Sequence, residues 1–160
     1  MLTGCMFEVD ATLQPYEVTD LDAGSLLGLV AEDREVELKV VRRKLRLAHQ
    51  FCVLHPVVEG EPVAGWGAVE RLDLGDLHDT LGGDGTPSVA AFAAEQYAVH
   101  AGLSRAAALS VLADTLDLHH RLPLLWAQVE LLHVEGWKAR RVAELSRHLS
   151  YDAARWFDDH

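Results

Sequence analysis

The pattern of apolar positions along the chain predicts helices and no firm strand. From about Asp22 to Leu54, apolar residues recur at the three- and four-residue spacing of one helix face. The stripe is made of Leu27, Val30, Leu38, Val41, Leu45, Ala48 and Cys52. Pro56 ends the pattern, because the residue before a proline is pushed out of helical geometry. We therefore expect a loose segment over 1–20 and a long amphipathic helix over 21–55.

The middle of the chain lacks this periodicity. Residues 56–87 are rich in glycine and proline and hold most of the acidic excess, with a short helix expected over 68–81. The glycines at 82, 83 and 85 could suggest a phosphate-binding loop. No Lys-Ser/Thr pair follows them and no apolar strand precedes them. We expect a flexible turn before a helix capped by Ser88.

Helical periodicity returns over 88–160, which predicts a bundle of short helices. Expected helices cover 89–101, 104–118, a segment from Pro123 that Gly136 breaks, 137–149, and a last helix capped by Ser150. Their expected inward side chains are Phe92, Tyr97, Val99, Leu109, Leu112, Leu116, Leu124, Leu125, Val129, Leu132, Val142 and Leu145, with Trp126 and Trp137 also buried and Trp66 exposed. The chain is therefore predicted to be an all-α protein with a single helical domain over 21–160.

A helix-turn-helix-like corner is expected within this bundle. Gly102 would form the turn, with small Ala98 four residues before it and Ser104 as the cap of the next helix. Tyr97, Ala101, Leu103, Ala108 and Val111 would be the other inward positions of the corner. Such a corner is the geometry of many DNA-reading motifs, although helical domains that bind no DNA use it too.

Composition and charge limit the classes of function. The 160 residues carry a formal net charge of −11, which argues against a protein that coats nucleic acid indiscriminately. No signal peptide or membrane span is apparent, so we expect a cytoplasmic protein without a membrane partner. Cys5 and Cys52 are too few for a metal knuckle, and Cys52 is expected to pack as a small hydrophobe.

Basic residues nevertheless gather in two runs, at 39–46 and at 138–155. Local basic faces on an acidic body can bind a phosphate backbone, although charge runs are often only solvated helix faces. The predicted nucleic-acid contacts are Arg105, on the second helix of the corner, and Lys138, Arg140, Arg141 and Arg147. Trp137 is expected in the core, with a platform for stacking an unpaired base as the alternative.

Several ordered pieces of the sequence together resemble one family. They read GGDGTP at 82–87, VAAFA at 89–93, GLS at 102–104, ADTLDLHHRLP at 113–123 running on to LW at 125–126, and WKARRVA at 137–143 with RHL at 147–149. In this order and spacing they resemble the DUF222 family, the helical region that precedes HNH endonuclease modules in the 13E12 repeat proteins. The long helix ending at His55-Pro56 is also similar to the family's N-terminal helix, so the likeness covers nearly the whole chain.

The resemblance implies a non-catalytic helical domain of a DNA-processing protein. In the family, a separate HNH module supplies a general-base His and a metal-binding His or Asn in a ββα fold. No such residue can be carried over here, and the chain is expected to be a fragment, a truncated gene product or an N-terminal portion. DNA is the expected partner. The alternative is an interaction module that pairs its long helix with itself or a partner helix.

The histidines give no independent sign of an enzyme, cofactor or metal. His119 and His120 are adjacent, so on a helix they should point about 100° apart and hold one metal poorly. Together with Arg121 they are expected to form a polar helix end, where cations suit the helix dipole. His133 and His148 are isolated in sequence. We therefore expect no catalytic residue, no metal ligand and no cofactor in this chain.

Overall fold

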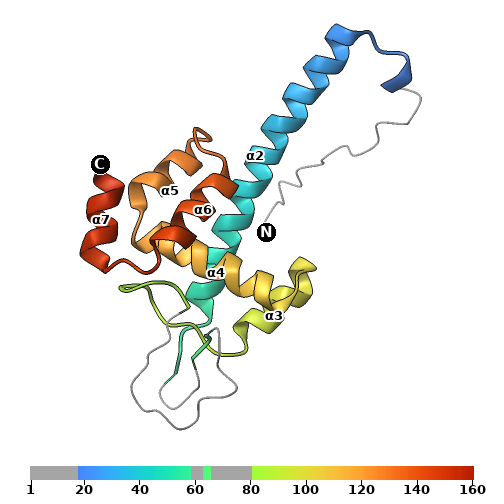
Figure 1. The fold of residues 1–160 in the computed structure, drawn as a ribbon. Helices are drawn as coiled ribbons and strands as arrows, with labels where there is room; N and C mark the ends of the chain where they lie inside the picture. The colour runs from blue at the N-terminus through green and yellow to red at the C-terminus, as the bar shows by residue number, and fades with distance from the viewer. Residues whose placement is uncertain (1–17, 59–62, 66–80) are drawn as a thin grey trace, which may run out of the picture. The chain divides into compact units, whose positions relative to one another are not determined.

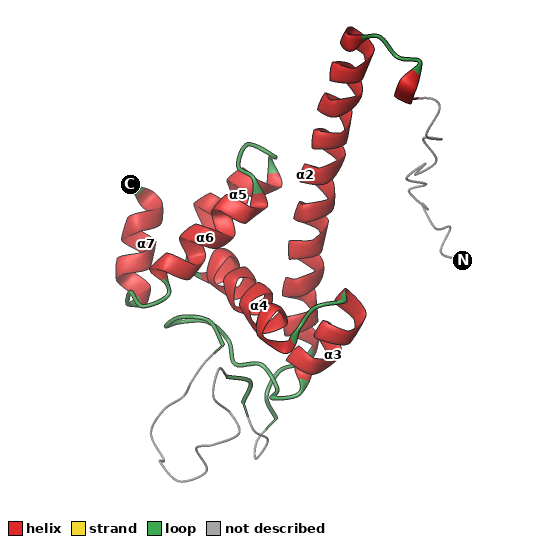
Figure 2. Ribbon diagram, turned by 45° about the vertical axis from the view of Figure 1, so that its right-hand side comes forward, coloured by secondary structure: helices red, strands yellow, loops and turns green. Residues whose placement is uncertain are grey.

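The computed structural model describes residues 18–58, 63–65 and 81–160, and over these residues the protein is all-α, as predicted (Figure 1, Figure 2). Its helices are α2 (Ala23–Leu54), α3 (Ala93–Ala101), α4 (Arg105–His120), α5 (Pro123–Glu130), α6 (Gly136–Ser146) and α7 (Tyr151–Asp159). None of the described helices is long and apolar enough to cross a membrane. The helix expected over 68–81, Trp66 and Cys5 lie outside the described residues.

The chain divides into two compact units, residues 1–37 and 38–160. The long helix α2 contributes to both, and its bounds lie within two residues of the predicted 21–55. Its start is fixed by Asp22, whose side chain accepts a hydrogen bond from the Ser25 amide at 2.8 Å. Its end at Leu54 lies two residues before Pro56.

The apolar stripe of α2 is buried only near its C-terminal end. Leu45, Ala48 and Cys52 lie in the core of the second unit, whereas Leu27 and Val30 of the first unit are 70% and 63% exposed. The fully buried part of the stripe is therefore the part that joins the two core clusters, Leu45, Ala48 and Cys52. Cys52 packs as a small hydrophobe, as expected, and burial raises the pKa of its thiol to about 12.

Helix α4 is the centre of the second unit, and every residue from Leu112 to Leu118 is buried. One core cluster joins α4 to α2, α3 and the loop before α3: Ala48, Cys52, Ala64, Leu81, Val89, Ala93, Ala94, Leu109, Leu112, Ala113 and Leu116. The other joins α4 to α2, α5 and α6: Leu45, Leu118, Leu122, Val129, Ala139 and Ala143. Because α4 has neighbours on several sides, its buried positions form a continuous run instead of a stripe.

The corner between α3 and α4 has the expected geometry. Gly102 adopts the left-handed conformation with φ 65°, and the Ser104 hydroxyl accepts a hydrogen bond from the Ala107 amide at 3.2 Å. Ala98 is 6% exposed, as close helix packing requires. Ala101 and Leu103, however, are exposed, so two of the predicted inward positions were wrong.

Helix α3 begins later than predicted, at Ala93, and Ser88 does not cap it. The preceding residues are extended because their backbone groups bond to other loops. The Ala64 amide donates to the Val89 carbonyl at 2.7 Å, and the Ala90 amide donates to the His55 carbonyl at 3.0 Å. Phe92 and Val99, which we expected to face inward, are exposed.

Helix α6 also begins differently from the prediction. Gly136 is its first residue and does not break α5, which ends at Glu130. A side chain at Gly136 would overlap Val41 of α2, so the glycine allows close packing there. Leu124, Leu145 and Trp137 are 51%, 56% and 64% exposed, contrary to the prediction that they are buried. Ser150 caps α7 as expected, accepting from the Ala153 amide.

Candidate functional site

In the described part of the second unit, five residues form an ion network around two buried carboxylates: Asp114, Asp117, Arg121, Arg140 and Arg147. The two carboxylates lie one turn apart on α4, with 3% and 0% of each side chain exposed. Arg147 bridges them, with N–O distances of 2.5 Å to Asp114 and 2.8 Å to Asp117. Arg140 pairs with Asp114 at 2.8 Å, and Arg121 pairs with Asp117 at 3.0 Å. The network therefore ties α6 and the turn after it to α4.

Arg121 was expected to belong to a polar helix end, but its side chain is fully buried. Its guanidinium donates to the carbonyl oxygens of Ser146, Arg147 and Leu149 at 3.2, 3.3 and 2.6 Å. These carbonyls lie at the C-terminal end of α6, where a helix has no internal donors left. Arg121 thus supplies the end of α6 with donors and positive charge from α4, which the sequence pattern did not reveal.

The glycine-rich segment before α3 packs on the same network. The Gly83 amide donates to Asp117 Oδ1 at 2.7 Å, and Thr86 Oγ1 donates to the Gly83 carbonyl at 2.8 Å. A Cβ at Gly83 would overlap the Arg121 guanidinium and lie 2.6 Å from the Arg147 carbonyl oxygen. Gly83 therefore lies in a closely fitted, buried part of the turn. The glycine is needed for close approach to an arginine, not to a phosphate.

Burial disfavours the charged forms of the network residues, whereas their oppositely charged partners favour these forms. Burial raises the pKa of the Asp114 carboxyl, and the charges of Arg140 and Arg147 act in the opposite direction. Burial disfavours the charged form of Arg147, but its hydrogen bond to Asp117 and the charges of both carboxylates raise its pKa overall. Each charged group in this region thus depends on an oppositely charged partner.

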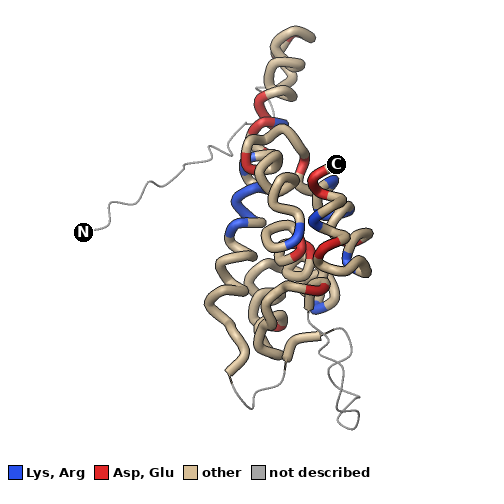
Figure 3. The backbone as a smooth tube through the Cα atoms, turned by 90° about the vertical axis from the view of Figure 1, so that its left-hand side faces the viewer, with Lys and Arg blue, Asp and Glu red and all other residues tan. Residues whose placement is uncertain are grey.

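The structure separates the five predicted nucleic-acid residues into two groups. Arg140 and Arg147 belong to the ion network, and 32% and 20% of their side chains are exposed. The other three form surface pairs: Arg105 with Glu95 at 2.5 Å, Lys138 with Glu135 at 3.4 Å, and Arg141 with Glu144 at 2.7 Å. Figure 3 shows basic and acidic positions interleaved along the described backbone. Each of the five residues pairs with a carboxylate. Among these partners only Asp114 and Asp117, which pair with Arg140 and Arg147, are buried.

Trp137 lies beside two of the exposed cations. Its indole N–H donates to a Glu135 carboxylate oxygen at 2.5 Å, and Lys138 Nζ is 5.4 Å from the ring centroid. Arg141 is four residues after Trp137 and three after Lys138, which places all three on neighbouring parts of the helix surface. We call Trp137, Lys138 and Arg141 the α6 surface group.

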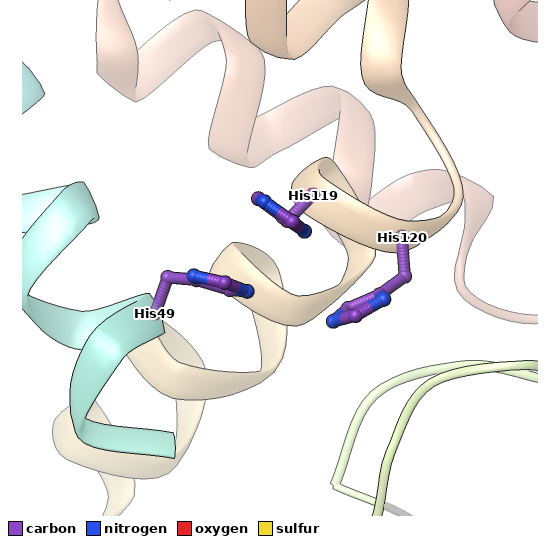
Figure 4. A group of neighbouring side chains, drawn as sticks. All are labelled: His49, His119 and His120. Atoms are coloured by element: carbon purple, nitrogen blue, oxygen red, sulfur yellow. The ribbon is translucent and has the colours of Figure 1, made fainter. Parts of the chain in front are cut away.

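A second cluster, which sequence reasoning missed, consists of His49, His119 and His120 (Figure 4). The ring centroids of His49 and His119 are 3.7 Å apart, and those of His119 and His120 are 4.9 Å apart. From their adjacency on a helix, His119 and His120 were expected to point about 100° apart. At the end of α4, however, both rings lie near His49 of α2. No local signal could have found this cluster, because it depends on the packing of two helices distant in sequence.

Comparison of the chain with protein-family models, curated proteins and solved structures gave no match. The resemblance to DUF222 therefore stays a prediction from the quoted motifs.

Proposed function

We propose that the chain is a non-catalytic helical domain of a DNA-processing protein, of the DUF222 type, and that it contacts nucleic acid through the α6 surface group. The observation that carries the proposal is the exposure of an aromatic ring beside two cations. The side chains of Lys138 and Arg141 are 54% and 59% exposed, and Trp137 is 64% exposed. Aromatic stacking on bases combined with cations along the backbone is a common way to bind single strands.

The ion pairs of the α6 surface group do not prevent such contact. Surface pairs contribute only about 0–1 kcal/mol, so a phosphate can replace Glu135 or Glu144 at low cost. Arg140 and Arg147 differ from these exposed cations. If either arginine bound a phosphate instead, the buried carboxylate of Asp114 or Asp117 would lose a cationic partner. We therefore assign phosphate contact to the exposed cations and a structural role to Arg140 and Arg147.

The pieces of sequence that carry the DUF222 resemblance support a scaffold role. They contain all five residues of the ion network and the glycine turn that packs on it. We infer that these motifs specify a helical framework. The cleavage chemistry belongs to the separate nuclease module that the resemblance implies.

A salt titration on single-stranded and duplex DNA tests the proposal. Because the chain has a net charge of −11, we expect measurable binding only at low salt, with a preference for the single strand. Joint Lys138→Ala and Arg141→Ala should weaken binding regardless of sequence. It should also lower the slope of log K against log salt by about 1.4 on a single strand, at ~0.7 per lost contact.

The matched control is Arg43→Ala with Lys44→Ala, which removes the same charge from an exposed part of α2. This control should keep nearly the wild-type slope. Equal losses in both double variants would show a general effect of charge and would contradict an α6 contact. Absence of binding by the wild-type chain at low salt would overturn the nucleic-acid proposal.

The alternative function is a self-associating helical module, and exposed apolar residues of α2 favour it. Leu27 and Val30 lie one turn apart and are largely exposed. A second copy of the chain could cover them in a paired helix. Light scattering over a range of concentrations distinguishes this function. A dimer that Leu27→Asp dissociates would support it, and a concentration-independent monomer would exclude it.

A further inference from the structure

The three histidines at the junction of α2 and α4 offer a set of ligands that the proposed function does not use. Each of His49, His119 and His120 presents one ring nitrogen, and these three nitrogens lie within 4.8 Å of one another. It is the one group of three or more potential ligands of this kind in the described part of the chain. Figure 4 shows the rings converging from two helices.

Two ring nitrogens of this cluster lack the partners that buried polar atoms normally have. Nε2 of His49 and Nε2 of His120 are buried, and neither has a hydrogen-bond partner in the structure. Most buried polar atoms in folded proteins have a partner, so two orphaned nitrogens in one cluster require an explanation. A cation that accepts their lone pairs would satisfy both.

The protonation state also suits metal binding. Burial lowers the pKa of His49 to about 4, with further contributions from the charges of His119 and His120. Burial likewise lowers the pKa of His119 and of His120. Each of these shifts favours the neutral imidazole, the form in which histidine binds metal.

We propose that His49, His119 and His120 form a binding site for a divalent transition metal of the zinc type. Imidazole ligands suit Zn²⁺ and its neighbours in the first transition series, whereas Mg²⁺ and Ca²⁺ prefer oxygen. Tetrahedral Zn–N bonds of about 2.1 Å would place the nitrogens about 3.4 Å apart. The rings of His49 and His119 are stacked with an interplanar angle of 21°, so one of them must turn for both in-plane lone pairs to meet at the metal. The nitrogens, which lie within 4.8 Å of one another, must also approach by roughly 1 Å.

The bound metal would have one open coordination position and would link two helices. Three protein ligands leave the fourth tetrahedral position for water or another small ligand. Trp126 packs edge-on against His119, with ring centroids 5.5 Å apart, and gives the cluster an apolar neighbour. Because one ligand comes from α2 and two from α4, the bound metal would join these helices within the second unit. The proposal does not depend on nucleic-acid binding.

Co²⁺ and Zn²⁺ titrations of the tag-free, chelator-treated chain test the site. We expect one Co²⁺ per chain with the intense visible absorption of four-coordinate cobalt, and displacement of this signal by Zn²⁺. Zn²⁺ at a hundredfold excess over Kd should raise Tm by roughly 5–10 °C. Failure to observe a four-coordinate cobalt spectrum would overturn the proposal.

Single variants locate the binding. His49→Gln and His119→Gln should each weaken Co²⁺ binding at least tenfold and abolish the Zn²⁺-dependent rise in Tm. The control is His133→Gln, because His133 lies on the exposed turn after α5 and is not part of the cluster. It should bind Co²⁺ as the wild type does. His119 is the more exposed ring, so its variant should fold even if the His49 variant does not. Wild-type affinity in His119→Gln, or equal loss in His133→Gln, would contradict the site.

Discussion

The ion network and the α6 surface group each include an arginine of α6, but the surroundings of these two arginines differ. Arg140 is 32% exposed and pairs with a buried carboxylate of α4. Arg141, the next residue, is 59% exposed and pairs with Glu144 on its own helix. Neighbouring residues on a helix point about 100° apart, so one can face the core while the other faces solvent. A run of basic residues is therefore not one functional unit.

The difference shows what a carboxylate partner does in each setting. A buried carboxylate needs its arginine partner, because an unpaired charge in the interior is strongly destabilising. An exposed arginine gains little from its partner and can exchange it for another anion. Arg140 and Arg147 are thus committed to the fold, whereas Lys138 and Arg141 are available to a ligand.

The largest effect is expected from the carboxylate at the centre of the network. Asp117→Asn keeps the shape but removes the charge that Arg121 and Arg147 contact, and we expect it to lower the free energy of unfolding by about 3 kcal/mol or more. Glu144→Gln, the matched change in a surface pair, should stay within about 0.5 kcal/mol of wild type. Urea unfolding followed by circular dichroism measures both. Equal stabilities would contradict the distinction between the two regions.

A smaller loss is expected at the turn that packs on the network. Gly83→Ala places a methyl group against the buried Arg121 guanidinium, which should cost about 1–3 kcal/mol. Gly28→Ala is the control, because a Cβ there meets nothing within 4 Å on an exposed stretch of α2. It should leave stability unchanged or raise it by up to about 1 kcal/mol. Thermal melts compare the two. A tolerant Gly83 would mean that the turn is not closely fitted.

The smallest effect on stability is expected at Trp137. Because this ring is exposed, Trp137→Ala should change the free energy of unfolding by about 0.5 kcal/mol or less. The same ring should lose fluorescence when single-stranded DNA binds, and heparin should not cause this loss. Subtracting the signal of Trp137→Phe isolates the ring from the other tryptophans. Equal quenching by heparin would argue against stacking.

Local signals in the sequence predicted much of the fold. The proline at 56, the turn glycine at 102 and the caps Ser104 and Ser150 each act through the backbone next to them. Such features can be identified without knowing the rest of the structure. The helix class and the corner followed from them.

Features that depend on packing between helices were missed. Gly136 looked like a helix breaker, but its role is set by Val41, far away in the chain. Arg121 was predicted to belong to a polar helix end. Its partners lie at the end of α6, so the sequence next to Arg121 gave no sign of them. The burial of Trp137 was inferred from apolar neighbours in sequence, although its face of α6 points away from the core. The histidine cluster similarly combines residues whose proximity only the tertiary fold creates.

One pair of variants tests the central claim that cations paired with buried carboxylates hold the fold, whereas exposed cations contact nucleic acid. Arg147→Met and Arg141→Met each remove one guanidinium from positions predicted as nucleic-acid contacts. Both the free energy of unfolding and the affinity for single-stranded DNA should be measured, at a temperature where both variants remain folded. We predict that Arg147→Met loses several kcal/mol of stability and keeps its affinity for single-stranded DNA. Arg141→Met should keep its stability and bind single-stranded DNA more weakly. A stable Arg147→Met protein with weakened DNA binding would contradict the account.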